Sequence, residues 1–166
     1  IFWLLVLFSP DSEQKKKKLE RFPFFSVIVP AYNEEKSIIS TLQSLVNLDY
    51  PKDKIEIIVV NDGSKDRTKG MVKQFISQHP SQIIILLNQE NQGKGKAMNK
   101  GLALAKGEYF ACLDADSFIA PNGLQAMFPI FEQDPNIAAV CPLLKVKNPQ
   151  SVLQKVQWYE YVVNMF

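Results

Sequence analysis

Short, almost wholly apolar runs alternate along the chain with longer segments whose apolar residues recur at helical spacing. Continuously apolar runs are typical of strands that are buried on both faces of a parallel sheet. The segments between them have the spacing of amphipathic helices, as Ile38, Leu42 and Leu45 illustrate. The alternation predicts an α/β fold with an open, mostly parallel sheet and helices on both faces. The expected strands are residues 25–30, 55–60, 83–87, 108–113 and 137–141.

Two residues mark expected helix boundaries. Glycine favours the ends of helices, so the helix after the third strand is expected to stop at Gly107. Proline disrupts helix interiors, so Pro129 is expected to bend or end the helix after the fourth strand.

The N-terminal residues differ in composition from the rest. Residues 1–8 are all apolar, which is too short for a membrane span of about 20 residues. Four consecutive lysines, 15–18, follow shortly afterwards. Because the chain begins with Ile rather than Met, we expect residues 1–10 to be the end of a transmembrane helix. Residues 11–24 would be a basic juxtamembrane linker, with the following domain on the cytoplasmic side. A solvated linker without membrane attachment is the alternative.

Charge and cysteine content narrow the functional class only slightly. Nineteen basic and seventeen acidic side chains give a net charge of +2, which does not favour a nucleic-acid binder. Cys112 and Cys141 each lie in an apolar run without metal-ligand spacing, so two buried, reduced thiols are expected. The sequence shows no serine–histidine–aspartate or cysteine–histidine arrangement, which argues against covalent acyl transfer.

Polar, turn-forming sequences follow the first four expected strands. In open α/β sheets, ligands bind outside the carboxyl ends of the strands, so these loops are expected to face one site. Neither a Walker A loop nor the dinucleotide glycine fingerprint occurs among them, which excludes those two templates. The loops are PAYNEE (30–35), NDGS (61–64), NQENQGKGK (88–96) and DADS (114–117).

The charged residues of these loops each have two interpretations. Asp114 and Asp116 either hold one hard cation, such as Mg²⁺ or Mn²⁺, or are solvated carboxylates that cap the next helix. Asp62 either accepts a hydrogen bond from a base or belongs to a tight Asp-Gly turn. Lys94 and Lys96 either bind an anion at the start of a helix or form a solvated basic loop.

Four motifs carry a family resemblance. SVIVPAYNEE, IEIIVVNDGSKDRT, NQGKGKAMNKGL and GEYFACLDADS resemble, in this order and spacing, the nucleotide-sugar-binding half of family 2 glycosyltransferases with the GT-A fold. The chain looks most like the membrane-bound members, which include synthases of cellulose, hyaluronan and poly-N-acetylglucosamine and enzymes that glycosylate lipids. The resemblance implies an incomplete, Rossmann-like GT-A domain over residues 25–150. Residues 151–166 would form an aromatic helix leading into the missing half.

The resemblance also implies roles for individual residues. Asp62 matches the aspartate that contacts the uracil of a UDP-sugar. Asp114 and Asp116 match the D-x-D motif, in which the aspartates contact the ribose and hold Mg²⁺ or Mn²⁺ on the diphosphate. Asp116 is the principal metal ligand in this interpretation. The other implied nucleotide-sugar-binding residues are Pro30, Ala31, Tyr32 and Glu34, around the base, and Lys94 and Lys96, near the nucleotide.

The implied reaction is an inverting transfer from a nucleotide-sugar to a polysaccharide or lipid acceptor, with a general base acting on the acceptor hydroxyl. The family's catalytic aspartate and the Q-x-x-R-W motif of its processive members do not occur before Phe166. We therefore expect the base beyond the end of this chain, and little turnover by the chain alone. Two alternatives are a GDP-sugar-dependent lipid-phosphate glycosyltransferase and a catalytically inactive nucleotide-sugar-binding module.

Overall fold

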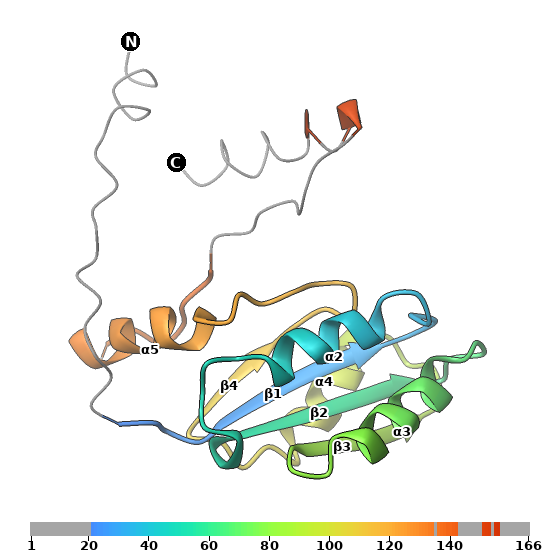
Figure 1. Cartoon of the computed structure of the whole chain (residues 1–166), viewed down its shortest axis with the longest axis horizontal. Coiled ribbons are helices and arrows are strands. Elements are labelled where there is room, and N and C mark those ends of the chain that lie inside the picture. The colour runs from blue at the N-terminus through green and yellow to red at the C-terminus, as the bar shows by residue number, and fades with distance from the viewer. Residues whose placement is uncertain (1–20, 135, 143–150, 154, 157–166) are drawn as a thin grey trace. The chain divides into compact units, whose positions relative to one another are not determined.

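The computed structural model describes residues 21–134, 136–142, 151–153 and 155–156. They belong to two compact units that divide after Pro129. The first unit contains a four-stranded parallel sheet with the strand order β3-β2-β1-β4 (Figure 1). The strands are β1 (Phe25–Ala31), β2 (Ile55–Asp62), β3 (Ile83–Gln89) and β4 (Tyr109–Cys112). The helices are α2 (Ile38–Val46), η1 (Lys52–Lys54), α3 (Thr68–Gln78), α4 (Lys94–Leu102) and α5 (Gly123–Gln133).

The two central strands are buried along their whole length. Every residue of β1 and β2 is buried, whereas the edge strands β3 and β4 are partly exposed. This burial explains why the central strands have continuously apolar sequences. Helices α2 and α3 cover one face of the sheet and α4 covers the other (Figure 1), which confirms the predicted open α/β sheet.

Each face has its own apolar core. Ile38 and Leu42 of α2 pack with Val29 and Val59 on the first face, and Phe128 of α5 belongs to the same cluster. The core of the opposite face is smaller and comprises Ile28, Ile58, Val60 and Ala97. Together the two cores fix the sheet between its helices, with the carboxyl ends of the strands left open at one edge.

Two predictions from apolar runs were wrong. Residues 137–141 form no strand, because no strand in the described part of the chain pairs with them. The thiols of Cys112 and Cys141 are free but exposed rather than buried. Cys112 ends the edge strand β4, where alternate residues such as Phe110 are exposed. An apolar neighbourhood in the sequence therefore did not ensure burial at the sheet edge.

The expected helix boundaries also needed correction. Helix α4 ends at Leu102, not at Gly107, and the chain then continues with i to i+3 backbone bonds such as Leu104 N to Gly101 O at 3.1 Å. A Cβ atom on Gly107 would lie 2.6 Å from Ser26 N and closer still to the carbonyl oxygen of Tyr109. Glycine is therefore needed there for close backbone approach at the entry to β4. Pro129 lies inside α5, so the predicted end of a helix at this residue was wrong, whereas a bend stays a prediction.

The remaining domain assignments stay predictions. Residues 1–20, expected to include the membrane segment, and residues 157–166 of the expected aromatic helix lie outside the described residues. The last linker residues are described, and Arg21 forms a two-bond ion pair with Glu108 at 3.0 and 3.1 Å. In the second unit, residues 152–153 and 155–156 are helical, and Val152 and Leu153 are exposed. Of the helices that the structure describes, none has the length and apolar character needed to cross a bilayer.

Candidate functional site

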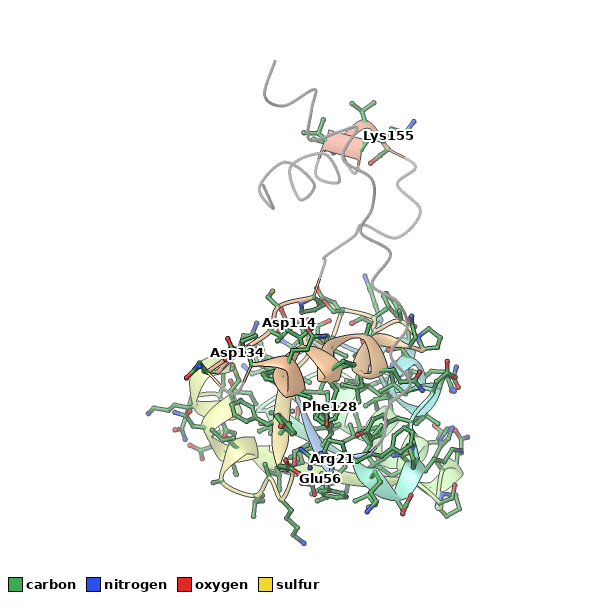
Figure 2. The ribbon with its side chains drawn as sticks, turned by 90° about the vertical axis from the view of Figure 1, so that its left-hand side faces the viewer. Arg21, Glu56, Asp114, Phe128, Asp134 and Lys155 are labelled. Atoms are coloured by element: carbon green, nitrogen blue, oxygen red, sulfur yellow. The ribbon has the colours of Figure 1, made fainter. Side chains whose placement is uncertain are left out.

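A cleft of about 250 Å³ opens at the carboxyl ends of β1, β2 and β4, beside the start of α4. It contains eight of the nine residues that the resemblance singled out, and Lys96 is the one that does not line it. Figure 2 shows Asp114 and Glu56 toward opposite ends of the sheet, as their positions after β4 and at the start of β2 require. The binding roles of these residues stay predictions. The lining residues are Pro30, Ala31, Tyr32, Glu34, Asp62, Lys94, Ala97, Asp114, Ala115 and Asp116.

The two aspartates after β4 lie on a turn that is anchored by the alanine between them. Ser117 N donates to the carbonyl of Asp114 at 2.9 Å, which closes the turn. Ala115 is buried in the core below, and its carbonyl accepts a hydrogen bond from Thr41 Oγ1 at 2.8 Å. The small apolar residue thus fixes the turn to α2, while the carboxylates on either side remain exposed.

Lys94, the first residue of α4, pairs with Asp114 across the cleft. Its Nζ atom lies 2.5 Å from Asp114 Oδ1, and both side chains are about half exposed. The hydrogen bond to Asp114 raises the pKa of Lys94, and partial desolvation opposes this effect. Among the described residues that line the cleft, Lys94 is the only cationic side chain.

The turn after β4 supplies two carboxylates of the kind that bind a divalent metal, but two side chains do not complete the metal's coordination shell. Asp114 already forms an ion pair with the Lys94 ammonium group, and Asp116 adds a second exposed carboxylate. The described residues contain no group of three or more metal-ligating side chains. Mg²⁺ typically takes one or two carboxylates and completes its shell with water and substrate phosphates. Asp114 and Asp116 therefore fit a metal that is shared with a bound diphosphate.

Asp62 fixes the loop that leads from β3 into α4. Its Oδ1 atom accepts hydrogen bonds from Gln89 Nε2 at 2.7 Å and Gln92 N at 2.9 Å, and Oδ2 accepts one from Gly93 N at 2.8 Å. Burial alone would raise the pKa of Asp62, but these three bonds outweigh it and lower the pKa below its ordinary value. The next residue, Gly63, adopts φ +75°, and a Cβ there would lie 2.7 Å from Asn91 N. The close approach at Gly63 therefore requires glycine, and Asp62 lines the cleft, so both interpretations of this Asp-Gly pair stay predictions.

Sequence reasoning missed a set of hydrogen bonds that joins the loops after β1 and β2. Residues 33–35 and 64–68, which we call the loop pair, exchange bonds in both directions: Asn33 N donates to Ser64 Oγ at 3.0 Å, and Lys65 N donates to Asn33 Oδ1 at 2.9 Å. Asn33 has φ 56°, a left-handed conformation that asparagine tolerates better than most residues. The loop pair includes Glu34 and directly follows Tyr32, and both of these residues line the cleft.

Asp66 is the central acceptor of the loop pair. Its carboxylate accepts from Thr68 N at 3.0 Å, Thr68 Oγ1 at 2.5 Å and Glu35 N at 3.1 Å. Burial would raise the pKa of Asp66, but these bonds together lower it. The Asp-x-Thr spacing before a helix was the signal in the sequence, because aspartate favours bonds to backbone N–H groups at helix starts.

Comparisons with known proteins relate the chain to one family by sequence. The model of the family "Glycosyl transferase family 2" matches residues 26–164. A poly-beta-1,6-N-acetyl-D-glucosamine synthase of Staphylococcus epidermidis is 34% identical over 146 residues, which is 88% of this chain and 34% of that protein. The corresponding synthase of Staphylococcus aureus strain COL is 37% identical over 134 residues, 81% of this chain and 32% of that protein. The chain thus spans about a third of the length of these curated relatives.

Solved structures show the same fold with bound donors. A mannosyltransferase, PcManGT from Pyrobaculum calidifontis in complex with GDP-Man and Mn²⁺, superposes with a TM-score of 0.74 and 31% identity, covering 97% of this chain and 44% of that one. S. aureus TarS 1-349 in complex with UDP-GlcNAc gives a TM-score of 0.62 and 28% identity, covering 75% of this chain and 41% of that one.

The family match covers most of the chain, and the fold agrees with the structural neighbours. The chain therefore belongs to glycosyl transferase family 2, a family of glycosyltransferase enzymes, and has the GT-A fold of these neighbours.

Proposed function

We propose that this chain binds a UDP-sugar together with a divalent metal and forms the donor site of an inverting glycosyltransferase. The observation that carries the proposal is the gathering of eight motif residues, from three strand ends and the start of α4, around one cleft. UDP-N-acetylglucosamine is the donor that we propose to test first. Its support is the resemblance to the staphylococcal synthases and to the TarS structure with UDP-GlcNAc.

The uracil ring would lie against Pro30, Ala31 and Tyr32, next to Asp62. A carboxylate offers about four acceptor positions, and the loop from β3 to α4 uses three of those on Asp62. The remaining position on Oδ2 suits the ring N–H of uracil. Asp62 would therefore contact the base while it holds its own loop in place.

The diphosphate would lie between the turn after β4 and the start of α4. Lys94 and the N-terminal N–H groups of the helix favour negative charge there. A metal held by Asp114 and Asp116 would supply positive charge that stabilises the departing diphosphate. The lining carboxylates are Glu34, Asp62, Asp114 and Asp116, and we assign the general base to none of them. That the general base lies outside this chain stays a prediction.

The acceptor and the location follow from the same resemblance. We propose a growing polysaccharide as the acceptor, because the relatives include poly-beta-1,6-N-acetyl-D-glucosamine synthases, with a lipid acceptor as the alternative. Attachment to the cytoplasmic side of a membrane is proposed from the apolar start and the lysine cluster at 15–18. A GDP-sugar donor is the second candidate, favoured by the likeness to the mannosyltransferase with GDP-Man and Mn²⁺.

Isothermal titration calorimetry tests the donor and the metal together. UDP, UDP-N-acetylglucosamine and GDP are titrated into the chain with and without Mn²⁺, and again with Mg²⁺. We expect metal-dependent binding of both uridine nucleotides, and a loss of at least about tenfold in affinity for Asp116→Asn, because a metal ligand and its charge are removed. Asp49→Asn, the same change at an exposed aspartate that does not line the cleft, is the matched control.

The outcomes separate the candidates. Tighter binding of GDP than of UDP would replace the UDP-sugar proposal by the GDP-sugar one. Uridine binding that depends on neither the metal nor Asp116 would remove the metal assignment. Absence of binding for all three nucleotides would refute the donor site itself.

A further inference from the structure

We propose that Lys94 competes with the divalent metal for Asp114, and that the donor's diphosphate ends this competition by drawing Lys94 away. Nucleotide binding and metal binding would then be coupled through a single side chain. The inference rests on the proposed function, since it concerns the same donor site, but it adds a role for Lys94 that phosphate binding alone does not include.

The geometry of the ion pair supports this competition for the Asp114 carboxylate. Lys94 Nζ lies 2.5 Å from Asp114 Oδ1, and Mg²⁺ binds carboxylate oxygens at about 2.0–2.1 Å. An ammonium group and a metal ion on the same oxygen would be no more than about 4.6 Å apart. Like charges at that separation repel each other, so a metal on Asp114 disfavours the present position of Lys94.

Lys94 also has a second position open to it, on the same side of the cleft. It is the first residue of α4, where N–H groups without intrahelical partners attract phosphate. Its side chain is about half exposed, and the four-carbon stem of a lysine is flexible. The ammonium group can therefore move from the carboxylate to a phosphate without movement of the helix.

Thermodynamic linkage gives the consequence. If the diphosphate releases Asp114 from Lys94, the nucleotide raises the affinity for the metal. The metal then raises the affinity for the nucleotide by the same factor. Lys94 would thus disfavour a metal bound without nucleotide and favour a metal bound with it.

The test measures Mn²⁺ affinity by electron paramagnetic resonance, without UDP and at saturating UDP. Lys94→Met should bind Mn²⁺ about two- to fivefold more tightly than the parent chain without UDP, because an exposed ion pair of this kind is lost as a competitor. With UDP, the same variant should gain less Mn²⁺ affinity than the parent chain gains. The effect of the substitution therefore shrinks or changes sign when the nucleotide is added.

Two variants separate the position of the charge from its loss. Lys69→Met removes the same charge at an exposed position of α3 that does not line the cleft, and should leave Mn²⁺ affinity without UDP unchanged. Lys94→Arg keeps the positive charge. Without UDP, it should bind Mn²⁺ as weakly as the parent chain and more weakly than Lys94→Met.

Each contrary result has one meaning. Unchanged or weaker Mn²⁺ binding by Lys94→Met without UDP would overturn the competition, while the metal and nucleotide dependence of Asp116→Asn would still support the donor site. An equal gain in Lys69→Met would show a general charge effect and would also overturn it. If the parent chain binds neither Mn²⁺ nor UDP, the proposed function fails first, and this inference fails with it.

Discussion

Replacement of Asp62 by asparagine tests the loop that connects β3 to α4. The carboxylate accepts three hydrogen bonds, and an asparagine amide can keep at most the two to Oδ1, since its NH₂ group would face the Gly93 N–H donor. A bond to a charged acceptor contributes about 1.5–3 kcal/mol and a neutral one about 0.5–1.5 kcal/mol. One lost bond and two weakened ones sum to about 3.5–6 kcal/mol, which is an upper limit. Because Gln92 and Gly93 are exposed and water can reach them, we expect about 2–3 kcal/mol of lost stability.

Urea denaturation followed by circular dichroism measures this loss, and calorimetry with UDP and Mn²⁺ measures its effect on the cleft. Asp116→Asn is the matched control, because it makes the same substitution at an exposed residue of the same cleft. Its stability should stay within about 0.5 kcal/mol of the parent chain. If Asp62→Asn is as stable as Asp116→Asn, the three bonds do not hold the loop, and the reasoning is refuted.

Three further predictions concern packing, the loop pair and pH. Gly107→Ala should cost about 3 kcal/mol or more, because its Cβ would meet the backbone of Ser26 and Tyr109. Gly70→Ala in α3, with nothing near its Cβ, should instead stabilise by about 0.5–1 kcal/mol in the same denaturation assay. Asp66→Ala should cost about 1–2 kcal/mol, as for other lost helix-start acceptors, and should weaken UDP binding; unchanged binding would contradict the role of the loop pair. The pKa values of Asp62 and Asp66 are lowered on folding from an ordinary 3.8, so their stabilisation is present above pH 3.8 and is lost as the pH falls through the lower folded values. Denaturation midpoints between pH 2.5 and 6 should show this decline, and Asp62→Asn should show less of it.

The central part of the fold was predictable from apolar pattern alone. Strands β1 and β2 are buried on both faces, so each of their positions has to be apolar or internally paired, and the runs are unmistakable. Further along the chain the same signal failed, since residues 137–141 have an apolar sequence but no partner strand among the described residues. Glu56 is the opposite case, a charged residue that lies buried inside a central strand. It is buried within β2, and its acceptors are satisfied by Ser26 Oγ at 2.5 Å and Lys106 N at 2.6 Å, residues that no local pattern connects to it.

The position of the site was also predictable, but its internal contacts were not. The rule that parallel strands present their carboxyl ends at one edge brought Asp62, Lys94 and Asp114 to one cleft. The atoms that each loop residue contacts belong to residues 20 to 34 positions away in the chain, as the bonds from Gly93 N to Asp62 Oδ2 and from Glu34 N to Thr68 Oγ1 show. Such contacts arise from loop conformation, which neither periodicity nor residue type specifies.

These contacts connect the two halves of the proposed donor site. Asp62, at the proposed base end, accepts from Gly93 N, and the next residue in the chain is Lys94. Lys94 pairs with Asp114, at the proposed phosphate end, and the buried Ala115 ties that turn to α2. Because the backbone of this segment is held at Gly93, the helix start would stay in place while the Lys94 ammonium group changes partners as proposed. The proposed coupling of nucleotide and metal requires a loop that stays in place, since movement of the whole loop would disturb the proposed contacts to the base, and the three bonds to Asp62 hold the loop.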